Sequence, residues 1–290
     1  MKNVINDSEP IAIDSNKGDI ITVFSFNPNK EYHMPGFFGP RAQGINSRRY
    51  NNVTKITVCY LTDAKKLAQY IPAPFEVADI PMVIAEYSCA KEVDWLAGRG
   101  YNMIGVNAAV KFNGKEDQLE GSLALVMWES LTDPILTGRE IKGVPKIYAD
   151  IPDHQVINGE WRANASHFSN RIVQITAGDL TALTPEQIVE AKKSVAGKNH
   201  WMGWKYIPNP DGVGAAISHP TLFPTEFETT EAWTGKGTVE WEHLTWEQNP
   251  TQYHIVNALA ELPNLGVVYT AVSKGSSVLE PEGRPVRLLK

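Results

Sequence analysis

Two long strand-like runs joined by a tight turn constrain the fold of this chain most. Residues 101–112 and 119–129 are both rich in apolar residues, and Asn113-Gly114 lies between them. An Asn-Gly pair adopts the positive φ angles of the turns that join adjacent antiparallel strands. The segment therefore predicts a β-hairpin, and its apolar strands must lie in the core of an antiparallel sheet.

Further strand-like runs lie on both sides of this hairpin. Their β-branched and aromatic content predicts strands over 55–61, 81–91, 146–151, 155–176, 223–246 and 265–278, with two strands each in the fourth and fifth ranges. Short helices are predicted over 63–70, after Thr132 and over 184–196. The chain shows no internal repeat and no linker. We therefore expect one α+β domain over 1–290, mainly antiparallel β, with a polar N-terminal arm at 1–20.

Composition narrows the class of protein. The 290 residues include 27 Lys and Arg and 33 Asp and Glu, which gives a net charge of −6. The chain has neither the basic stripe of a nucleic-acid-binding protein nor the roughly 18-residue apolar run of a membrane helix. Its first residues lack the apolar core of a signal peptide. We therefore expect a cytoplasmic protein with a small-molecule partner, and neither nucleic acid nor membrane as a partner.

The residues that usually bind metals and nucleotides do not form their usual patterns. The histidines have no i, i+4 pair, and no Cys-x-x-Cys occurs. Asp211-Gly-Val-Gly214 lacks the third glycine of a dinucleotide loop and is more typical of a turn. The sequence therefore predicts no metal and no cofactor.

One lysine is set in an unusual local context. Residues 138–146 read Gly-Arg-Glu-Ile-Lys-Gly-Val-Pro-Lys, so that Lys146 follows Pro145 and has Val144 and Ile147 as apolar neighbours. Proline fixes the local backbone, and apolar surroundings favour the neutral amine over the ammonium. A neutral amine is the nucleophile that forms Schiff bases. The alternative is that the lysine simply keeps its ammonium in water above an apolar stem.

This segment resembles the acetoacetate decarboxylase family, in which a Gly-Arg-Glu-Leu-type stretch leads into a Pro-Lys that carries the catalytic amine. Other segments resemble that family in the same order, between about Arg48 and Val272. They are Tyr60-Leu-Thr-Asp63, Val110-Lys-Phe-Asn-Gly114, Lys205-Tyr-Ile-Pro-Asn-Pro-Asp-Gly212 and Glu231-Ala-Trp-Thr-Gly235.

The resemblance implies a double, cone-like antiparallel β-barrel, a lysine deep in a mostly apolar pocket, and a homo-oligomer. Lys146 falls on the Schiff-base lysine, and Glu86 falls on a carboxylate of the family's pocket. Trp128 and Val144 fall on or near positions that line the pocket. These side chains are therefore the first candidates for the site.

Other positions of the family's site are altered or uncertain. A second lysine follows the catalytic one in the family, and Ile147 stands there in this chain. A second pocket glutamate falls on Met103. Arg48 and Arg49 are the two candidates for the family's active-site arginine. The missing cation removes one device that favours a neutral amine, which puts acetoacetate itself in question as the substrate.

Three functions follow from these residues. The first is a lyase that decarboxylates a small β-keto acid through an iminium on Lys146, with Glu86 positioning the substrate or moving protons. The first alternative is an aldolase-dehydratase that uses the same lysine on pyruvate-like substrates. The second alternative is a non-catalytic barrel that binds a small ligand, with Lys146 as a charge partner.

Overall fold

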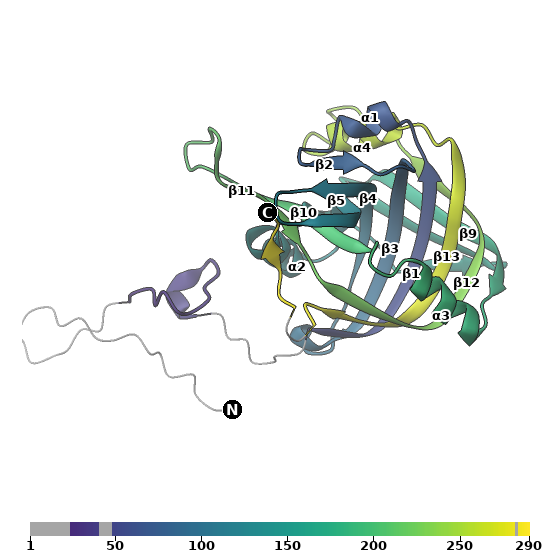
Figure 1. Ribbon diagram of the computed structural model, residues 1–290, viewed down its shortest axis with the longest axis horizontal. Helices are drawn as coiled ribbons and strands as arrows, with labels where there is room; N and C mark the ends of the chain where they lie inside the picture. The colour runs from purple at the N-terminus through teal and green to yellow at the C-terminus, as the bar shows by residue number, and fades with distance from the viewer. Residues whose placement is uncertain (1–23, 41–47, 282–283) are drawn as a thin grey trace, which may run out of the picture. The chain divides into compact units, whose positions relative to one another are not determined.

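A computed structural model describes residues 24–40, 48–281 and 284–290 (Figure 1). The chain divides into two compact units, residues 1–46 and residues 47–290. The predicted polar arm at 1–20 lies outside the described residues. The larger unit contains all of the described strands. The single domain over 1–290 stays a prediction.

The described part of the smaller unit is built on aromatic contacts. Phe24, Phe26 and Tyr32 meet edge to face, with ring centroids 4.9–6.2 Å apart. The short 3-10 helix η1 (Gly36–Phe38) adds Phe37 to this cluster. Edge-to-face contact is the arrangement that aromatic rings prefer, so it stabilises this short segment.

The larger unit is one mostly antiparallel sheet of fourteen described strands, and only β5–β6 and β5–β10 pair in parallel. The strand order is β14-β11-β10-β5-β4-β3-β1-β13-β12-β9-β8-β7, with β2 beside β4 and β6 beside β5. The strands are β1 (Arg49–Leu61), β2 (Phe75–Val77), β3 (Met82–Val93), β4 (Tyr101–Asn113), β5 (Gln118–Glu129), β6 (Lys146–Tyr148), β7 (Gln155–Ile157), β8 (Glu160–His167), β9 (Asn170–Ala182), β10 (His200–Pro208), β11 (Ala215–Leu222), β12 (Thr225–Trp241), β13 (Gly266–Leu279) and β14 (Arg287–Leu288).

Short helices connect these strands. They are α1 (Ala64–Ala68), η2 (Asp94–Leu96), α2 (Thr132–Thr137), the π-helical turn η3 (Gly138–Lys142), α3 (Pro185–Ser194) and α4 (Tyr253–Ala260). None of the described helices has the length and apolar character needed to cross a membrane. The predicted capping box at α3 is confirmed, because Thr184 and Gln187 exchange side-chain and backbone hydrogen bonds.

The predicted hairpin is confirmed as β4 and β5, which pair from Asn113↔Gln118 to Met103↔Glu129. The prediction of two strands over 223–246 is wrong, because β12 runs unbroken through Gly235 and Gly237. A Cβ at Gly235 would lie 2.4 Å from the Gly178 carbonyl oxygen, so this glycine permits close approach of β9 and does not form a turn.

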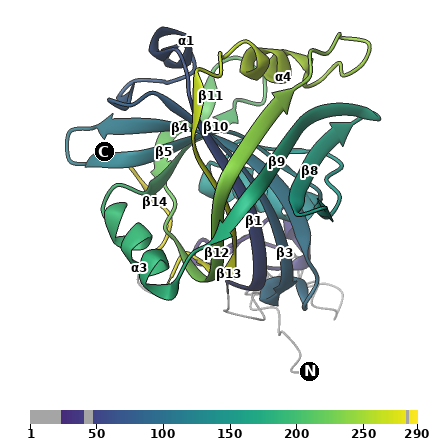
Figure 2. The ribbon, with the colours of Figure 1, turned by 90° about the vertical axis from the view of Figure 1, so that its right-hand side faces the viewer.

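Figure 2 shows the central strands β12, β13, β1 and β3 side by side. The two faces of these strands carry different cores. One face buries the largest cluster, with Ile56, Tyr87 and Ile104 at its centre and α4 packed against it through Val256. The opposite face carries two smaller clusters, around Tyr50 and Tyr101 and around Met127, Val144 and Phe223. Successive residues of a strand point to opposite faces, so register alone decides which side chains meet.

The mainly antiparallel β architecture with few helices is confirmed, while the closed double barrel is not. Strands β7 and β14 end the order of the described strands without pairing to each other. Both end strands are short, which leaves little open edge at the two ends of the sheet.

Candidate active site

Lys146 lies in one row of residues that crosses four strands. Glu86 on β3 pairs with Gly105 on β4, Gly105 pairs with Met127 on β5, and Met127 pairs with Lys146 on β6. Residues in one row point to the same face of a sheet. Lys146 and Glu86 therefore share a face, but three strand spacings, about 14 Å, separate their backbones.

A buried carboxylate is the partner of the Lys146 amine. Only 9% of Lys146 is exposed, and Glu129 is fully buried. Lys146 Nζ lies 2.7 Å from Glu129 Oε1 and donates to the Pro134 carbonyl oxygen at 3.2 Å. Burial raises the pKa of Glu129, and the charge of Lys146 opposes that rise. Among the described residues, neither oxygen of Glu129 has a hydrogen-bond partner of good geometry, and its contact with Lys146 is the ion pair through Oε1.

The backbone that precedes Lys146 folds around its side chain. Helix α2 runs into the π-turn η3, and Gly143 ends that turn with a φ of +74°. A Cβ on Gly138 would lie 2.3 Å from Lys146 Cδ. Arg139 donates to the Lys146 carbonyl oxygen at 3.0 Å. The segment 138–146 thus forms a loop whose first residue leaves room for the lysine at its end.

A second charged cluster lies within electrostatic reach of Lys146. Glu280, at the end of β13, accepts from both Lys142 and Arg48. Burial lowers the pKa of Lys142, Glu280 opposes this shift, and the charges of Arg48 and Lys146 add to it. The Lys142 ammonium also lies 4.9 Å from the centre of the Phe223 ring.

Apolar side chains form the walls of this part of the molecule. Met127, Val144 and Phe223 are buried in one cluster, and Met103 and Trp201 pack against it. The predicted residues Val144 and Met103 therefore lie in one cluster, and Met127 of that cluster is the neighbour of Lys146 across the sheet. Apolar walls keep water away and strengthen the charge interactions of the site.

Two predicted residues lie away from the lysine. Trp128 points to the opposite face, where its Nε1 donates to Gln252 Oε1 at 2.8 Å. It is fully buried in the large core, so it does not fit the pocket-lining role expected of it. The reason is strand alternation, because its neighbours Met127 and Glu129 take the site face. Glu86 is engaged by Lys55 at 2.9 Å and by Thr57 Oγ1 at 3.1 Å.

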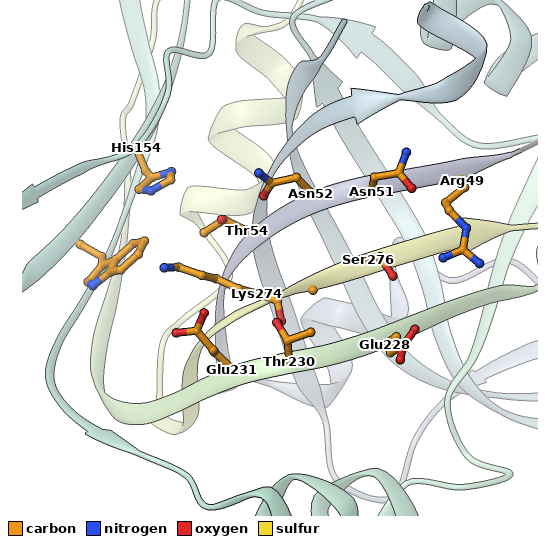
Figure 3. Close-up of a pocket in the computed structure, with 12 residues that line it drawn as sticks. Arg49, Asn51, Asn52, Thr54, His154, Glu228, Thr230, Glu231, Lys274 and Ser276 are labelled. Atoms are coloured by element: carbon orange, nitrogen blue, oxygen red, sulfur yellow. The ribbon is translucent and has the colours of Figure 1, made fainter. Parts of the chain in front are cut away.

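The two candidate arginines have different surroundings. Arg48 belongs to the Glu280 cluster, whereas Arg49 lines a polar hollow of about 710 Å³. Figure 3 shows this hollow with Arg49 towards one end and His154 towards the other. Lys146, Glu129 and Glu280 are not among the residues that line this hollow. Arg48 is thus the candidate that the structure brings towards the lysine.

Two residues of the site were missed from the sequence, namely Glu129 and Glu280. A carboxylate at the end of the apolar run 123–128 was a local signal for Glu129. Lys142 stands four residues before Lys146 and was visible as a nearby cation. No local signal pointed to Glu280. Among the described residues, no group of three or more His, Cys, Asp or Glu side chains is arranged to hold a metal ion.

The chain belongs to the acetoacetate decarboxylase family, whose model matches residues 33–274. Acetoacetate decarboxylase from Burkholderia multivorans (strain ATCC 17616 / 249) is 26% identical over 218 residues, which cover 73% of this chain and 78% of that protein. The homologue from Burkholderia vietnamiensis (strain G4 / LMG 22486) is 25% identical over the same length.

Solved structures share the fold. The crystal structure of acetoacetate decarboxylase from Legionella pneumophila matches with a TM-score of 0.69 at 21% identity, covering 92% of this chain and 98% of that one. The enduracididine biosynthesis enzyme MppR, complexed with pyruvate, matches with a TM-score of 0.65 at 15% identity, covering 90% and 97%. These likenesses show a shared fold, and the match of the family model over residues 33–274 confirms the predicted family.

Proposed function

We propose that this protein is a Schiff-base-forming lyase that acts on a small oxo acid, with Lys146 as the nucleophile. The observation that carries the proposal is the presentation of one nearly buried amine by the segment 138–146, beside apolar walls and 2.7 Å from a buried carboxylate. A lysine amine in such a site is suited to nucleophilic catalysis on carbonyl compounds.

The first steps need a proton acceptor at the lysine nitrogen. Glu129 Oε1 lies beside Nζ and can take a proton from the ammonium, so that the neutral amine attacks the ketone carbon. The carboxyl group passes this proton to the carbonyl oxygen and then carries a second proton from nitrogen to the resulting hydroxyl, which leaves as water. The product is an iminium, which withdraws electrons from the neighbouring carbon bonds. The Arg48 and Lys142 cations are the candidates for holding the acid's carboxylate.

Decarboxylation of a β-keto acid is the first reaction to test. In such an iminium, the electron pair of the breaking carbon–carboxylate bond moves towards nitrogen, and CO₂ leaves behind an enamine. The curated relatives bear the name acetoacetate decarboxylase, which supports this reaction class. Glu86 shares the face of Lys146, so its proposed contact is with the far end of a longer substrate.

An aldolase-dehydratase is the second candidate. It uses the same lysine and is favoured by the altered positions, because Ile147 and Met103 stand where the resemblance places a second lysine and a second glutamate. The structural relative MppR has been solved with the condensation product of pyruvate and imidazole 4-carboxaldehyde. An enamine that adds to an aldehyde and then loses water would give an unsaturated oxo acid.

Borohydride trapping tests the nucleophile. The protein is incubated with acetoacetate, pyruvate and longer oxo acids, reduced, digested and mapped by mass spectrometry. We expect an adduct on Lys146 with at least one acid, and none in Lys146→Ala at unchanged circular dichroism. Lys236→Ala serves as the control, because the Lys236 side chain is 86% exposed and pairs with Asp179 on β9.

The products then separate the candidate reactions. Release of CO₂ from the trapped acid supports the decarboxylase, and an unsaturated oxo acid from pyruvate plus an aldehyde supports the aldolase-dehydratase. A folded protein that forms no adduct with any oxo acid contradicts the proposal. The second alternative, a non-catalytic protein that binds a small ligand, would then be favoured.

A further inference from the structure

The second oxygen of the Glu129 carboxyl group, Oε2, is buried beside the Lys146 amine without a hydrogen-bond partner among the described residues. Oε1 forms an ion pair with Lys146 Nζ at 2.7 Å, and neither oxygen has a hydrogen bond of good geometry among the described residues. Oε2 is the buried oxygen that faces away from this ion pair. Leaving a buried carboxylate oxygen without a partner costs free energy. An oxygen of this kind beside a nucleophile is a feature that a bound substrate can use.

The geometry of an iminium defines what Oε2 would meet. The carbon next to the iminium carbon is two bonds away from Nζ. A carboxylate with one oxygen on Nζ can therefore bring its other oxygen to that carbon. The iminium carbon has two such neighbours. In a β-keto acid one of them carries the carboxylate and the other only hydrogen or alkyl groups, and a carboxylate held beside Glu129 in a site this buried would be repelled. In a 2-oxo acid one neighbour is the carboxylate carbon itself, and the other carries the hydrogens that a base can remove.

We propose that Glu129 is a catalytic base that removes a proton from the carbon beside the iminium of a 2-oxo acid bound to Lys146. The inference rests on the proposed Schiff base. In this step Glu129 takes the proton, the C–H electron pair forms the carbon–carbon double bond, and the C=N π pair moves to nitrogen. The enamine that results regains a proton from Glu129 in the reverse step. Between the two steps the carboxyl proton exchanges with water, so the net result is replacement of that hydrogen by one from the solvent.

The charges around the site fit a single carboxylate on the other side of the iminium carbon. Lys142 and Arg48 are two cations that share the one carboxylate of Glu280. The cluster therefore keeps one net positive charge, with the side chains of Lys142 and Glu280 18% and 8% exposed and that of Arg48 40% exposed. Glu129 and this cluster would then act on the two ends of a 2-oxo acid, one on its hydrogen-bearing carbon and the other on its carboxylate.

Proton exchange in the wild-type protein is the direct test. The protein is incubated with pyruvate in D₂O, and loss of the methyl signal is followed by ¹H NMR alongside borohydride trapping at Lys146. We expect exchange well above the rate with Lys146→Ala. The exchange rate should increase with pH as Glu129 ionises, because the carboxylate is the active form of a base.

Variants of Glu129 test whether this carboxylate is the base that removes the proton. Glu129→Gln should form the borohydride adduct more slowly, because Glu129 also serves Schiff-base formation, so exchange is divided by the amount of trapped adduct. This normalised exchange rate should fall by about 10²–10⁴-fold, the usual contribution of a general base. Glu129→Asp keeps the charge with a shorter reach, so it should exchange at an intermediate rate and serves if the first variant does not fold. Glu120→Gln is the matched control on the same strand, because Glu120 is nearly half exposed and pairs with Lys198.

The outcomes distinguish this inference from the function on which it rests. An adduct on wild-type Lys146 without any methyl exchange overturns the role of Glu129 and leaves the Schiff base intact. Wild-type exchange rates in Glu129→Gln also overturn it. Failure to trap any oxo acid on Lys146 contradicts the proposed function itself.

Discussion

The absence of a side chain at Gly138 leaves the space that the Lys146 side chain fills. Gly138 has helical backbone angles (φ −64°, ψ −42°), so alanine fits its conformation. The added Cβ would instead lie 2.3 Å from Cδ and 2.6 Å from Cε of Lys146. The constraint at this position is therefore space for the lysine and not backbone freedom.

Gly138→Ala is predicted to displace the lysine without unfolding the protein. A displacement of about 1 Å in a catalytic group can lower a rate on the order of 10–100-fold, and we expect that loss in the rate of borohydride-trapped adduct formation. Gly178→Ala is the control, since its Cβ would only meet Glu160 at an ordinary 3.6 Å. Unchanged trapping in Gly138→Ala, measured beside thermal unfolding, would contradict the structural role of this glycine.

At the scale of elements, the tip of the β4–β5 hairpin is held by the C-terminal residues. Arg287 of β14 donates to both oxygens of Asp117, at 2.9 and 2.5 Å, and the Lys290 backbone N–H donates to Oδ2 at 2.9 Å. The hydrogen bond from Arg287 is the main cause that lowers the pKa of Asp117 from 3.8 to about 2. Burial opposes this shift.

This clamp predicts a defined pH dependence of stability. Because the pKa of Asp117 is lower in the folded state, its ionised form adds to the free energy of unfolding. This contribution is present above pH 3.8 and is lost as the pH falls towards about 2. Urea unfolding midpoints should therefore decline less steeply over this window in Asp117→Asn than in the wild type. Asp79→Asn, a change at an exposed partner of Lys111, should retain the wild-type slope. Equal slopes in all three proteins would refute the clamp.

At the scale of the whole molecule, one part of the sheet edge is open and apolar. Strand β12 pairs with β13 only as far as Ala271, and its Gly237 still approaches the buried Thr270 side chain. Residues 266–269 therefore have β1 as their strand neighbour among the described strands. Leu265, Val268 and Tyr269 are 47–64% exposed there. An open apolar edge is a site where another chain can pair.

We predict that this edge contributes to the expected homo-oligomer. Val268→Lys places a charge on the edge and should lower the molar mass measured by light scattering, with circular dichroism unchanged. Val189→Lys on α3, another half-exposed valine, should not change the mass. A wild-type monomer, or an oligomer that survives Val268→Lys, would contradict the prediction.

Much of the fold was readable from local sequence. The Asn113-Gly114 hairpin, the strand pattern and the capped helix α3 depend on residues a few positions apart, and such signals act before any long-range contact forms. The context of Lys146 is local for the same reason, because Gly138, Gly143 and Pro145 shape the loop that presents it. The sequence by itself therefore determined the sheet, the family and the candidate nucleophile.

Only the tertiary structure decided which side chains meet that nucleophile. Glu86 shares the face of Lys146, but strands β4 and β5 lie between them. Glu129 contacts the Lys146 amine, whereas Trp128 points to the opposite face. Glu280 reaches the cluster from the far end of the chain. These outcomes depend on strand register, and a shift of one residue exchanges the two faces of a strand. Register is a property of the whole sheet, so no local pattern in the sequence could choose between these carboxylates.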